Sequence, residues 1–295
     1  MHLATLTCNR DIRQTLLQAE SIQKFVNPCT HWVIVNQYKI SDDHKRRWFE
    51  YLNPFYTKHK LELIFPEDIQ VDNPILHNIP YGTLYNNGWK YQFTVAKLIK
   101  DDYLCLTPKN FFIKNVELEN YRNVVGNGTL INNIMSEGQQ EISKFLNQTP
   151  PDFVFSSHPP MVMNYKVLTE RLGDMTEFDK FWDRMTLKTI ETNGKFGIMD
   201  WQFYSYLMAN RFHWTITKDA FNSNIRSLNY EKFSKDPLSF LDNVYSQEKV
   251  VTLGMHRQFL EYCNENDLML INQWLSNKGL TVKLKKLKYH KTINI

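Results

Sequence analysis

Short apolar runs alternate with helix-like segments in the first part of the chain, and this alternation limits the folds open to it. Apolar runs with the length of buried strands occur at residues 3–7, 31–35, 61–65 and 103–107. Helix-like segments lie between them, at 12–26 after Asp11, at 41–51 with Ser41 as the cap, and at 89–100. This order is typical of an α/β fold with a mostly parallel sheet, and right-handed crossovers place helices on both of its faces.

The second half has a more mixed pattern. Short strands are predicted at 153–155, 212–217 and 249–253. Helices are predicted at 164–172, 177–192 and 200–210, with a last helix at 256–277. A proline pair near residue 150 suggests a soft boundary, so we divide the chain into 1–150, 151–280 and a tail at 281–295. We expect the first two parts to form one compact unit.

Positive charge is concentrated at the end of the chain. The formal net charge is +4, and residues 281–295 contain five lysines and no acidic residue. Subtracting these lysines leaves −1 for residues 1–280, which disfavours broad nucleic-acid binding by the body. The tail is either a solvated terminal segment or a contact for an anionic surface such as nucleic acid or lipid.

Signature motifs of several enzyme classes do not occur in the sequence. It has neither G-x-G-x-x-G nor G-x-x-x-x-G-K-S/T, and neither H-E-x-x-H nor G-x-S-x-G. Only 10 of its 295 residues are glycine, which disfavours a fold with many glycine-rich phosphate loops. These features argue against dinucleotide-dependent dehydrogenases, P-loop ATPases, zincins and α/β-hydrolases.

The cysteines and the apolar runs indicate the cellular compartment. Cys8, Cys29, Cys105 and Cys263 are scattered without a C-x-x-C pair, which argues against a structural zinc site and a disulfide framework. No apolar run approaches the roughly 18 residues that a membrane span needs, and we find no secretory signal. We expect a cytoplasmic protein, in the host cytoplasm if a phage encodes it.

Ligands of open parallel sheets bind outside the carboxyl ends of the strands. In this chain that rule selects the loop at 7–11 and the loop at 107–110. Short motifs around these loops and beyond them, over roughly residues 1–260, resemble a known family. The motifs are Ala4-Thr5-Leu6-Thr7-Cys8-Asn9-Arg10-Asp11, Gly88-Trp89 with Gln92 and Lys97-Leu98, Thr107-Pro108-Lys109-Asn110-Phe111-Phe112, Ser157-His158-Pro159-Pro160-Met161, Met199-Asp200-Trp201-Gln202-Phe203-Tyr204 and Leu253-Gly254-Met255-His256-Arg257.

The family that these motifs resemble is the GT-A-fold glycosyltransferase-like family of phages and bacteria, most of whose members are uncharacterised. The resemblance implies a GT-A-like, Rossmann-like sheet, with residues 1–150 binding a nucleotide sugar and residues 151–280 forming the acceptor side and a C-terminal helix. Such folds end the fourth strand with Asp-x-Asp, whose carboxylates hold Mn²⁺ or Mg²⁺ against the diphosphate. Here the corresponding residues are Thr107-Pro108-Lys109-Asn110, without a carboxylate.

This departure from the family pattern leaves two interpretations open. In a working site, Lys109 supplies a positive charge to the diphosphate, Thr107 and Asn110 are neutral hydrogen-bonding partners, and metal dependence is weak or absent. In the other interpretation the site has decayed in a non-catalytic relative.

Asp200 is the candidate catalytic residue. The segment at 199–204 resembles the family's helix start at which inverting enzymes place a carboxylate that deprotonates the acceptor hydroxyl. The alternative is an ordinary acidic residue favoured by the dipole of the helix.

The resemblance also implies donor-binding residues at two other places. Asn9, Arg10 and Asp11 would bind the nucleotide, although Asp11 alternatively serves as a helix cap. His256 and Arg257 would contact the diphosphate, with His256 also suited to a metal, or they simply begin a surface helix.

Two more candidates have plain alternatives. Lys97 would approach the donor site, or it is a solvated lysine. His158 would contact the acceptor, or it belongs to a turn held by two prolines.

The sequence therefore predicts a glycosyltransferase that uses a nucleotide-sugar donor and an unknown hydroxyl acceptor, carried by a glycan, lipid, protein or modified nucleic acid. The first alternative is a catalytically inactive module of the same fold that binds a nucleotide or a glycan. The second is a phage structural or interaction protein that uses its basic tail.

Overall fold

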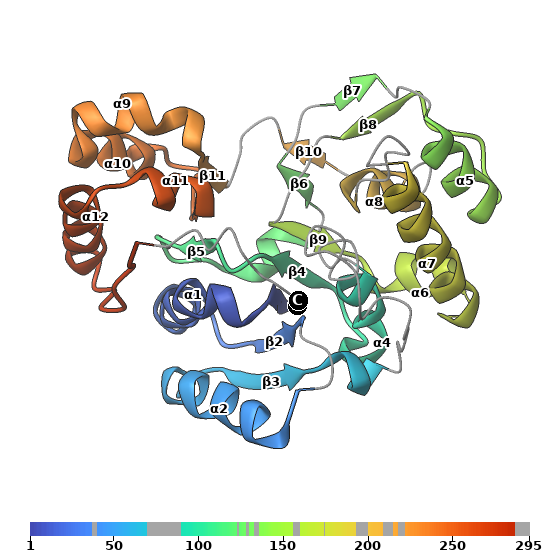
Figure 1. The fold of residues 1–295 in the computed structure, drawn as a ribbon, viewed down its shortest axis with the longest axis horizontal. Helices are drawn as coiled ribbons and strands as arrows, with labels where there is room; N and C mark the ends of the chain where they lie inside the picture. Colours follow the sequence, from blue (N-terminus) through green and yellow to red (C-terminus); the bar gives the residue numbers. More distant parts are fainter. Residues whose placement is uncertain are drawn as a thin grey trace.

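The structure is a computed structural model of the 295-residue chain. The residues that it describes are 1–36, 40–69, 90–122, 124–127, 130–132, 136–155, 160–173, 175–192, 200–208, 215–217 and 222–286. Its centre is a sheet of five strands in the order β3-β2-β1-β4-β9 (Figure 1). These strands are β1 (His2–Thr7), β2 (Thr30–Val35), β3 (Lys60–Ile64), β4 (Tyr103–Leu106) and β9 (Met161–Met163).

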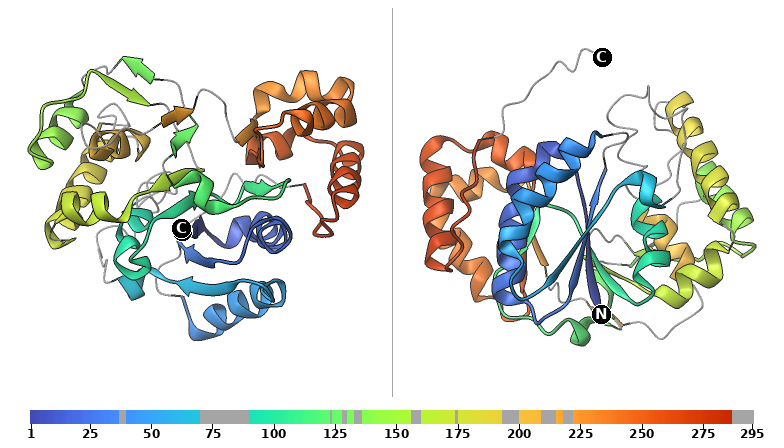
Figure 2. Two further views of the ribbon diagram at one scale, coloured as in Figure 1. Left: turned by 180° about the vertical axis from the view of Figure 1, so that it is seen from behind. Right: turned by 90° about the horizontal axis from the view of Figure 1, so that it is seen from below.

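The first four strands are parallel and β9 runs antiparallel to β4. All residues of β1 after His2 are buried, because helices cover both faces of the sheet. In the right-hand view of Figure 2, α1 (Ile12–Phe25) and the C-terminal helices lie on one side of the sheet. The α/β architecture with a mostly parallel sheet and helices on both faces is therefore confirmed.

Local signals explain the first helices. Ser41 caps α2 (Asp42–Leu52) by accepting a hydrogen bond from the His44 N–H at 3.3 Å, as the sequence predicts. Asp11 stands at the N-cap position of α1, but the prediction that its side chain caps the helix is wrong. Within the described residues, its carboxylate accepts no capping hydrogen bond and instead meets the Cys8 thiol at 3.3 Å.

The helix predicted at 89–100 has a break. Residues 90–94 are helical, a turn follows at Val95, and α4 is the short segment Ala96–Ile99. Lys100 then adopts a left-handed conformation with φ of 54°, which ends the helix before β4. Trp89 lies outside the described residues.

Three of the later helices lie near predicted positions, namely α6 (Tyr165–Leu172), α7 (Met175–Glu191) and α8 (Asp200–Met208). Three others were not predicted: α5 (Glu137–Phe145), α9 (Tyr230–Lys235) and α10 (Pro237–Ser246). The last two are α11 (Arg257–Tyr262) and α12 (Glu265–Asn277). Short 3-10 segments lie at Asn9–Asp11, Asn53–Phe55, Pro66–Ile69, Leu118–Tyr121 and Ser227–Asn229. The single helix predicted at 256–277 is wrong, because Asn264 begins a new helix with a capping box that includes Asp267.

Smaller sheets complete the fold. β11 (Asn222–Ile225), β12 (Thr252–Met255) and β5 (Asn110–Phe112) form a three-stranded sheet in that order. Two further pairs are β6 (Val124–Asn127) with β10 (Thr215–Thr217) and β7 (Leu130–Asn132) with β8 (Phe153–Phe155). The strand predicted at 249–253 is displaced, since its pairing with β11 and β5 covers 252–255.

The two predicted parts of the chain share buried residues. β9 belongs to the central sheet, and one apolar cluster joins Ala4 and Cys105 of that sheet to Phe178 and Phe203 of the later helices. The boundary near residue 150 stays a prediction.

The beginning of the lysine-rich tail packs against the body. The backbone N–H groups of Thr281 and Val282 donate to the Glu20 carboxylate at 2.7 and 2.9 Å. Leu284 is buried, and its backbone N–H and C=O both bond to the Asn272 side chain. Lysines 283, 285 and 286 are exposed, and residues 287–295 lie outside the described part of the chain.

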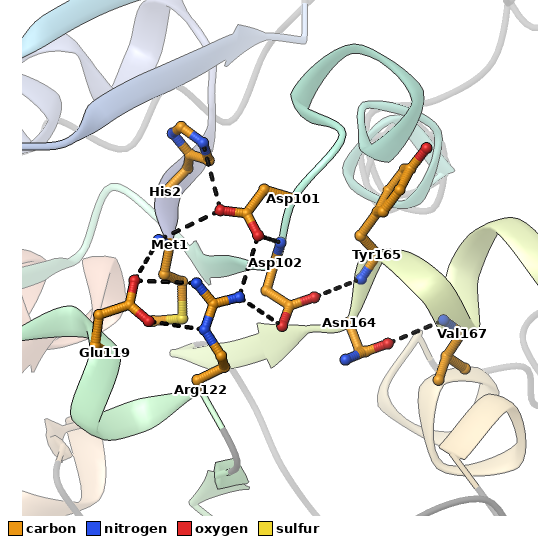
Figure 3. A network of polar contacts seen from close by, with 9 residues as sticks. All are labelled: Met1, His2, Asp101, Asp102, Glu119, Arg122, Asn164, Tyr165 and Val167. Atoms are coloured by element: carbon orange, nitrogen blue, oxygen red, sulfur yellow. Dashed lines mark hydrogen bonds and ion pairs between the residues drawn. The ribbon is translucent and has the colours of Figure 1, made fainter.

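A charged network holds the amino ends of the sheet strands (Figure 3). The Arg122 guanidinium contacts Asp101 at 3.1 Å, Asp102 at 3.0 Å and Glu119 at 2.7 Å. The Met1 amino group lies 2.5 Å from Glu119. These two cations hold the pKa of Glu119 at about 2, well below its ordinary value, with the Arg122 hydrogen bonds as the larger cause.

Among the helices of the described residues, none is both long and apolar enough to cross a membrane.

Candidate functional site

The candidate site is built around the turn that follows β4. The backbone N–H of Asn110 donates to the Thr107 carbonyl at 2.9 Å. The Asn110 Oδ1 atom accepts from the Thr107 N–H at 3.2 Å and from the Thr107 hydroxyl at 2.6 Å. Asn110 is completely buried, so its side chain shapes the turn from inside. The turn leaves Lys109 partly exposed between buried neighbours.

Gln18 of α1 holds this turn against the sheet. Its Nε2 atom donates to the carbonyl oxygens of Thr107, at 2.8 Å, and of Asn110, at 2.5 Å. Its Oε1 atom accepts from the Thr5 hydroxyl of β1 at 2.8 Å. Because the amide nitrogen faces two carbonyls, its orientation is fixed and every polar atom of this buried side chain is used.

The hydrogen bonds continue through the sheet to Tyr56. Since the Thr5 hydroxyl donates to Gln18, His31 Nε2 must carry the proton that it shares with Thr5 at 2.8 Å. His31 Nδ1 is then the acceptor for the Tyr56 hydroxyl at 2.6 Å. Complete burial lowers the pKa of His31 to about 3, and burial raises the pKa of Tyr56 above its ordinary value. The relay is therefore neutral over the physiological range.

The pairing of β12 with β5 brings the backbone of Met255, the residue before His256, beside Lys109. The Met255 N–H donates to the Lys109 carbonyl at 3.0 Å, and His256 follows immediately in the chain. The Met255 carbonyl accepts from Gln14 Nε2 of α1 at 3.0 Å. Residues separated by almost 150 positions thus meet at the carboxyl end of the central sheet. Arg257 begins α11 and forms an ion pair with Glu261 of the same helix at 3.1 Å.

The loop after β1 lies at the same end of the sheet, because β1 and β4 are parallel neighbours. Asn9 is exposed, and its Oδ1 atom accepts from the Trp48 indole of α2 at 2.9 Å. Arg10 and Asp11 are half-buried. Burial, and to a smaller extent the neighbouring Asp11 carboxylate, raises the pKa of the Cys8 thiol to about 12, so this cysteine stays protonated.

Asn110 also connects the turn to β11. Its Nδ2 atom donates to Asn222 Oδ1 at 3.3 Å, and the Thr252 hydroxyl donates to the same oxygen at 2.9 Å. Asn222 and Thr252 are buried and stand opposite each other in the register of β11 and β12. The region is rich in neutral amides and hydroxyls.

Three of the predicted site residues are not seen at this end of the sheet, because one lies elsewhere and the side chains of two lie outside the described residues. Lys97 is exposed on α4, shortly before β4 begins, and so lies toward the amino end of the strand. His158 lies outside the described residues. Asp200 is the first residue of α8, and its side chain is likewise outside the description.

The residues after β4 do not fit a divalent cation. Mn²⁺ and Mg²⁺ prefer carboxylate oxygens, whereas the turn offers a lysine and an asparagine whose oxygen already accepts two hydrogen bonds. Across the described part of the chain, no three His, Cys, Asp or Glu side chains gather in a group that could hold a metal ion.

Sequence reasoning missed the polar face of α1. Gln14, Gln18 and Ser21 are buried. They bond to β12, to the turn after β4 and to β5, with Ser21 Oγ accepting from the Phe112 N–H at 3.0 Å. Their spacing of four and three residues, on one face of a helix, was the available signal. By contrast, the apolar residue Ile12 at the start of the same helix is only half-buried.

Neither a protein-family model nor a curated protein sequence matches the chain. Among solved structures, mouse xyloside xylosyltransferase 1 in its apo form is similar with a TM-score of 0.47 at 9% identity, over 86% of this chain and 96% of that chain. The galactosyltransferase LgtC in complex with donor and acceptor sugar analogs gives 0.46 at 14% identity, over 94% and 100%. The glycosyltransferase GlyE of Streptococcus pneumoniae gives 0.46 at 11% identity, over 98% and 67%. At this level of similarity, no residue role is transferred from these proteins.

Proposed function

We propose that the chain is a glycosyltransferase that moves a sugar from a nucleoside-diphosphate donor to a hydroxyl acceptor in the cytoplasm. The observation that carries this proposal is the meeting of the loop after β1, the turn after β4 and the start of α11 at one end of the sheet. Ligands of open α/β sheets bind at this end. Three of the six motifs that resemble the glycosyltransferase-like family, those at 4–11, 107–112 and 253–257, lie in these segments.

Lys109 is the proposed charge partner of the diphosphate. A leaving diphosphate gains negative charge as the bond to the sugar breaks, and an ammonium group at hydrogen-bond distance stabilises that charge. His256 follows Met255, whose N–H bonds to the Lys109 carbonyl, and its imidazole is proposed to donate a further hydrogen bond to the diphosphate. Arg257 is held by Glu261, so we assign it a supporting role. Because the turn does not fit a divalent cation, no step of this mechanism uses one.

Thr107 and Asn110 are proposed to act by positioning Lys109. The Asn110 side chain uses its oxygen on Thr107 and its nitrogen on Asn222, and it is completely buried. It therefore fixes the turn rather than touching the donor.

For the nucleotide and the acceptor we keep the sequence-based assignments. Asn9, Arg10 and Asp11 would contact the nucleotide, and the Trp48 indole holds the Asn9 side chain in place. Asp200 would take the proton of the acceptor hydroxyl, which strengthens the nucleophile as the new bond forms. His158 stays a proposed acceptor contact.

One observation favours a second function, a module that binds a nucleotide or a glycan without transferring it. The Thr107 hydroxyl and the Asn110 oxygen bond to each other at the place where related folds carry metal-binding carboxylates. A site closed in this way can bind a donor and still lack the charge stabilisation that transfer requires.

The exposed lysines 283, 285 and 286 give some support to the remaining alternative, an interaction protein with a basic surface. The buried Leu284 between them anchors this segment of the chain. Deleting the segment that follows them, 287–295, and replacing these three lysines would then abolish salt-dependent binding to RNA or DNA.

The test compares Lys109→Met with Lys97→Met, an exposed lysine away from the proposed site. Calorimetric titration with UDP, GDP and CDP, with EDTA or with Mn²⁺, measures affinity. A charged hydrogen bond contributes about 1.5–3 kcal/mol, so Lys109→Met should weaken the bound nucleotide roughly 10- to 100-fold. Lys97→Met should bind like the unchanged protein.

Asp200→Asn separates the transferase from the binding module. In the transferase, this variant keeps the nucleotide affinity and loses sugar transfer, measured as release of nucleoside diphosphate with a panel of acceptors. If no nucleotide or sugar nucleotide binds the unchanged protein, the proposed function is wrong. An affinity that depends on Mn²⁺ would contradict the role of Lys109.

A further inference from the structure

One face of the sheet β11-β12-β5 carries a row of neutral polar residues. Strand alternation and register place Asn222 and Asn224 of β11 beside Thr252 and Gly254 of β12, with Asn110 of β5 opposite Gly254. The opposite face carries apolar residues and belongs to a hydrophobic cluster. Within the described residues, the row itself holds no acidic or basic side chain.

The orientation of the amides in this row follows from a backbone group. The Thr107 N–H can only donate, so the atom of Asn110 that it meets must be the oxygen. The Asn110 nitrogen therefore points to Asn222 and must meet an oxygen there. The Thr252 hydroxyl donates to that same oxygen. The Asn222 nitrogen consequently points away from both partners.

This nitrogen is a buried donor with an unused bonding capacity. Asn222 is 5% exposed, and its Nδ2 atom has no hydrogen-bond partner among the residues that the structure describes. The Oδ1 atom of Asn224, on the same face, also lacks one within the described chain. Buried polar atoms nearly always have partners in folded proteins, so each of these two atoms calls for a ligand atom or a water molecule.

Gly254 provides the room that the Asn224 side-chain oxygen occupies. A Cβ at this position would collide with Asn224 Oδ1 and would stand 3.0 Å from Asn110 Nδ2. The backbone of Gly254 does not need a glycine for its conformation, since the structure records positive φ angles only at other described residues. Close approach is thus the physical reason for glycine here.

We propose that Asn222 and Asn224 bind a hydroxyl group of a saccharide. A hydroxyl accepts from the Asn222 nitrogen and donates to the Asn224 oxygen, so one group satisfies both atoms. An ionised phosphate or carboxylate oxygen has no proton to donate to the Asn224 oxygen, so it satisfies only one of the two atoms. The inference deepens the proposed function, because the row joins the turn that carries Lys109 through Asn110.

The test uses Asn222→Asp. The carboxylate keeps an oxygen for the Asn110 nitrogen and the Thr252 hydroxyl, and it replaces only the unpartnered donor. Asn229→Asp is the matched control, because the Asn229 Oδ1 accepts from the Arg226 N–H at 2.8 Å and the residue lies outside the row. Circular dichroism and thermal unfolding of both variants verify that they fold.

Binding is measured in two arms, since the sugar can come from the donor or from the acceptor. The first arm is calorimetry with UDP, UDP-glucose, UDP-galactose, UDP-N-acetylglucosamine and GDP-mannose. The second is ligand-observed NMR with the methyl glycosides of glucose, galactose, N-acetylglucosamine and xylose. Asn222→Asp should weaken at least one sugar nucleotide or glycoside about tenfold and leave UDP unchanged, whereas Asn229→Asp should change neither.

A second variant avoids the added charge. Gly254→Ala places a methyl group beside Asn224, at the end of a flexible side chain that can move, so the fold should survive. It should reduce saccharide binding by a similar factor, and it decides the outcome if Asn222→Asp does not fold.

The outcomes separate this inference from the proposed function. If nucleotides do not bind but a glycoside does and Asn222→Asp weakens it, the proposed function fails and the saccharide site stands. The inference is overturned if Asn222→Asp and Gly254→Ala bind every sugar nucleotide and glycoside like the unchanged protein, or if no saccharide binds in either arm. In that case Asn222 holds only water.

Discussion

At the amino end of the central sheet, charged side chains at the surface pair with one another, whereas at the carboxyl end neutral side chains are buried and linked in a relay. Arg122 contacts three acidic residues at the amino end, and Glu119 there is more than half exposed. At the carboxyl end, Gln18 and Asn110 are completely buried. Exposed charges are hydrated and screened, while buried amides must find partners inside the protein. The first end can therefore lose a contact at small cost, and the second cannot.

We expect the largest loss of stability from replacing Gln18, whose amide connects the buried groups at the carboxyl end of the sheet. Gln18→Met removes the side-chain donor to the Asn110 carbonyl and the acceptor of the Thr5 hydroxyl, whereas the Thr107 carbonyl keeps the Asn110 N–H. Each buried unsatisfied group costs about 1–3 kcal/mol, so we expect the free energy of unfolding to fall by about 3 kcal/mol.

Urea denaturation of the purified protein measures this change. Gln23→Met is the control on the same helix, where the side chain bonds to Thr57 in an exposed position and the loss should stay below about 1 kcal/mol. Equal losses of unfolding free energy for Gln18→Met and Gln23→Met would contradict the larger contribution expected from the buried Gln18 amide.

The second prediction concerns pH. The pKa of His31 is about 3 in the folded protein and 6.5 in the unfolded chain, so only the unfolded chain binds a proton between these values. Stability is then complete above pH 6.5 and decreases as the pH falls, by about 1.4 kcal/mol per unit from this residue. At the amino end, the lowered pKa of Glu119 removes stability only below its ordinary value of 4.5.

His31→Gln isolates this contribution, because glutamine can donate and accept in the same relay without titrating. Urea denaturation between pH 7 and pH 4.5 should give a shallower slope for the variant than for the unchanged protein. Parallel slopes would contradict a neutral buried His31.

The smallest effect is expected at the amino end. Arg122→Met removes partly exposed contacts to Asp101 and Glu119, and such pairs contribute about 1 kcal/mol or less. The third partner, Asp102, is buried but keeps a hydrogen bond from the Tyr165 N–H at 2.9 Å. The effect of Arg122→Met should shrink further when the ionic strength is raised, because salt screens exposed charges. The effect of Gln18→Met should not change with salt, and thermal unfolding of both variants at low and high salt checks this contrast.

Local sequence signals predicted the first four strands within one residue at each end and the Ser41 cap. A buried strand needs a continuous apolar run, and a cap needs one side chain beside the first turn, so neighbouring residues contain both signals. The same reasoning selected the loops at 7–11 and 107–110, since strand direction determines the end of the sheet at which ligands bind. The roles assigned to Asp200, His158 and Lys109 stay predictions.

Local sequence signals could not predict which distant segments pair with one another. The strand predicted at 249–253 is found at 252–255, as β12. Its position depends on the register with β11 and β5, which decides which residues pair. The break at Asn264 had a local signal, a cap residue followed three positions later by Asp267, but an apolar pattern that continued on both sides concealed it.

The sequence by itself determined the α/β alternation, the direction of the first strands and the end of the sheet where polar loops gather. Only the tertiary structure decided that Gln18 holds a turn 89 positions away and that Asn110 meets Asn222 at a separation of 112. The reason is that a buried amide looks like a surface amide in a sequence. Its burial and its partners exist only after strands and helices have packed together.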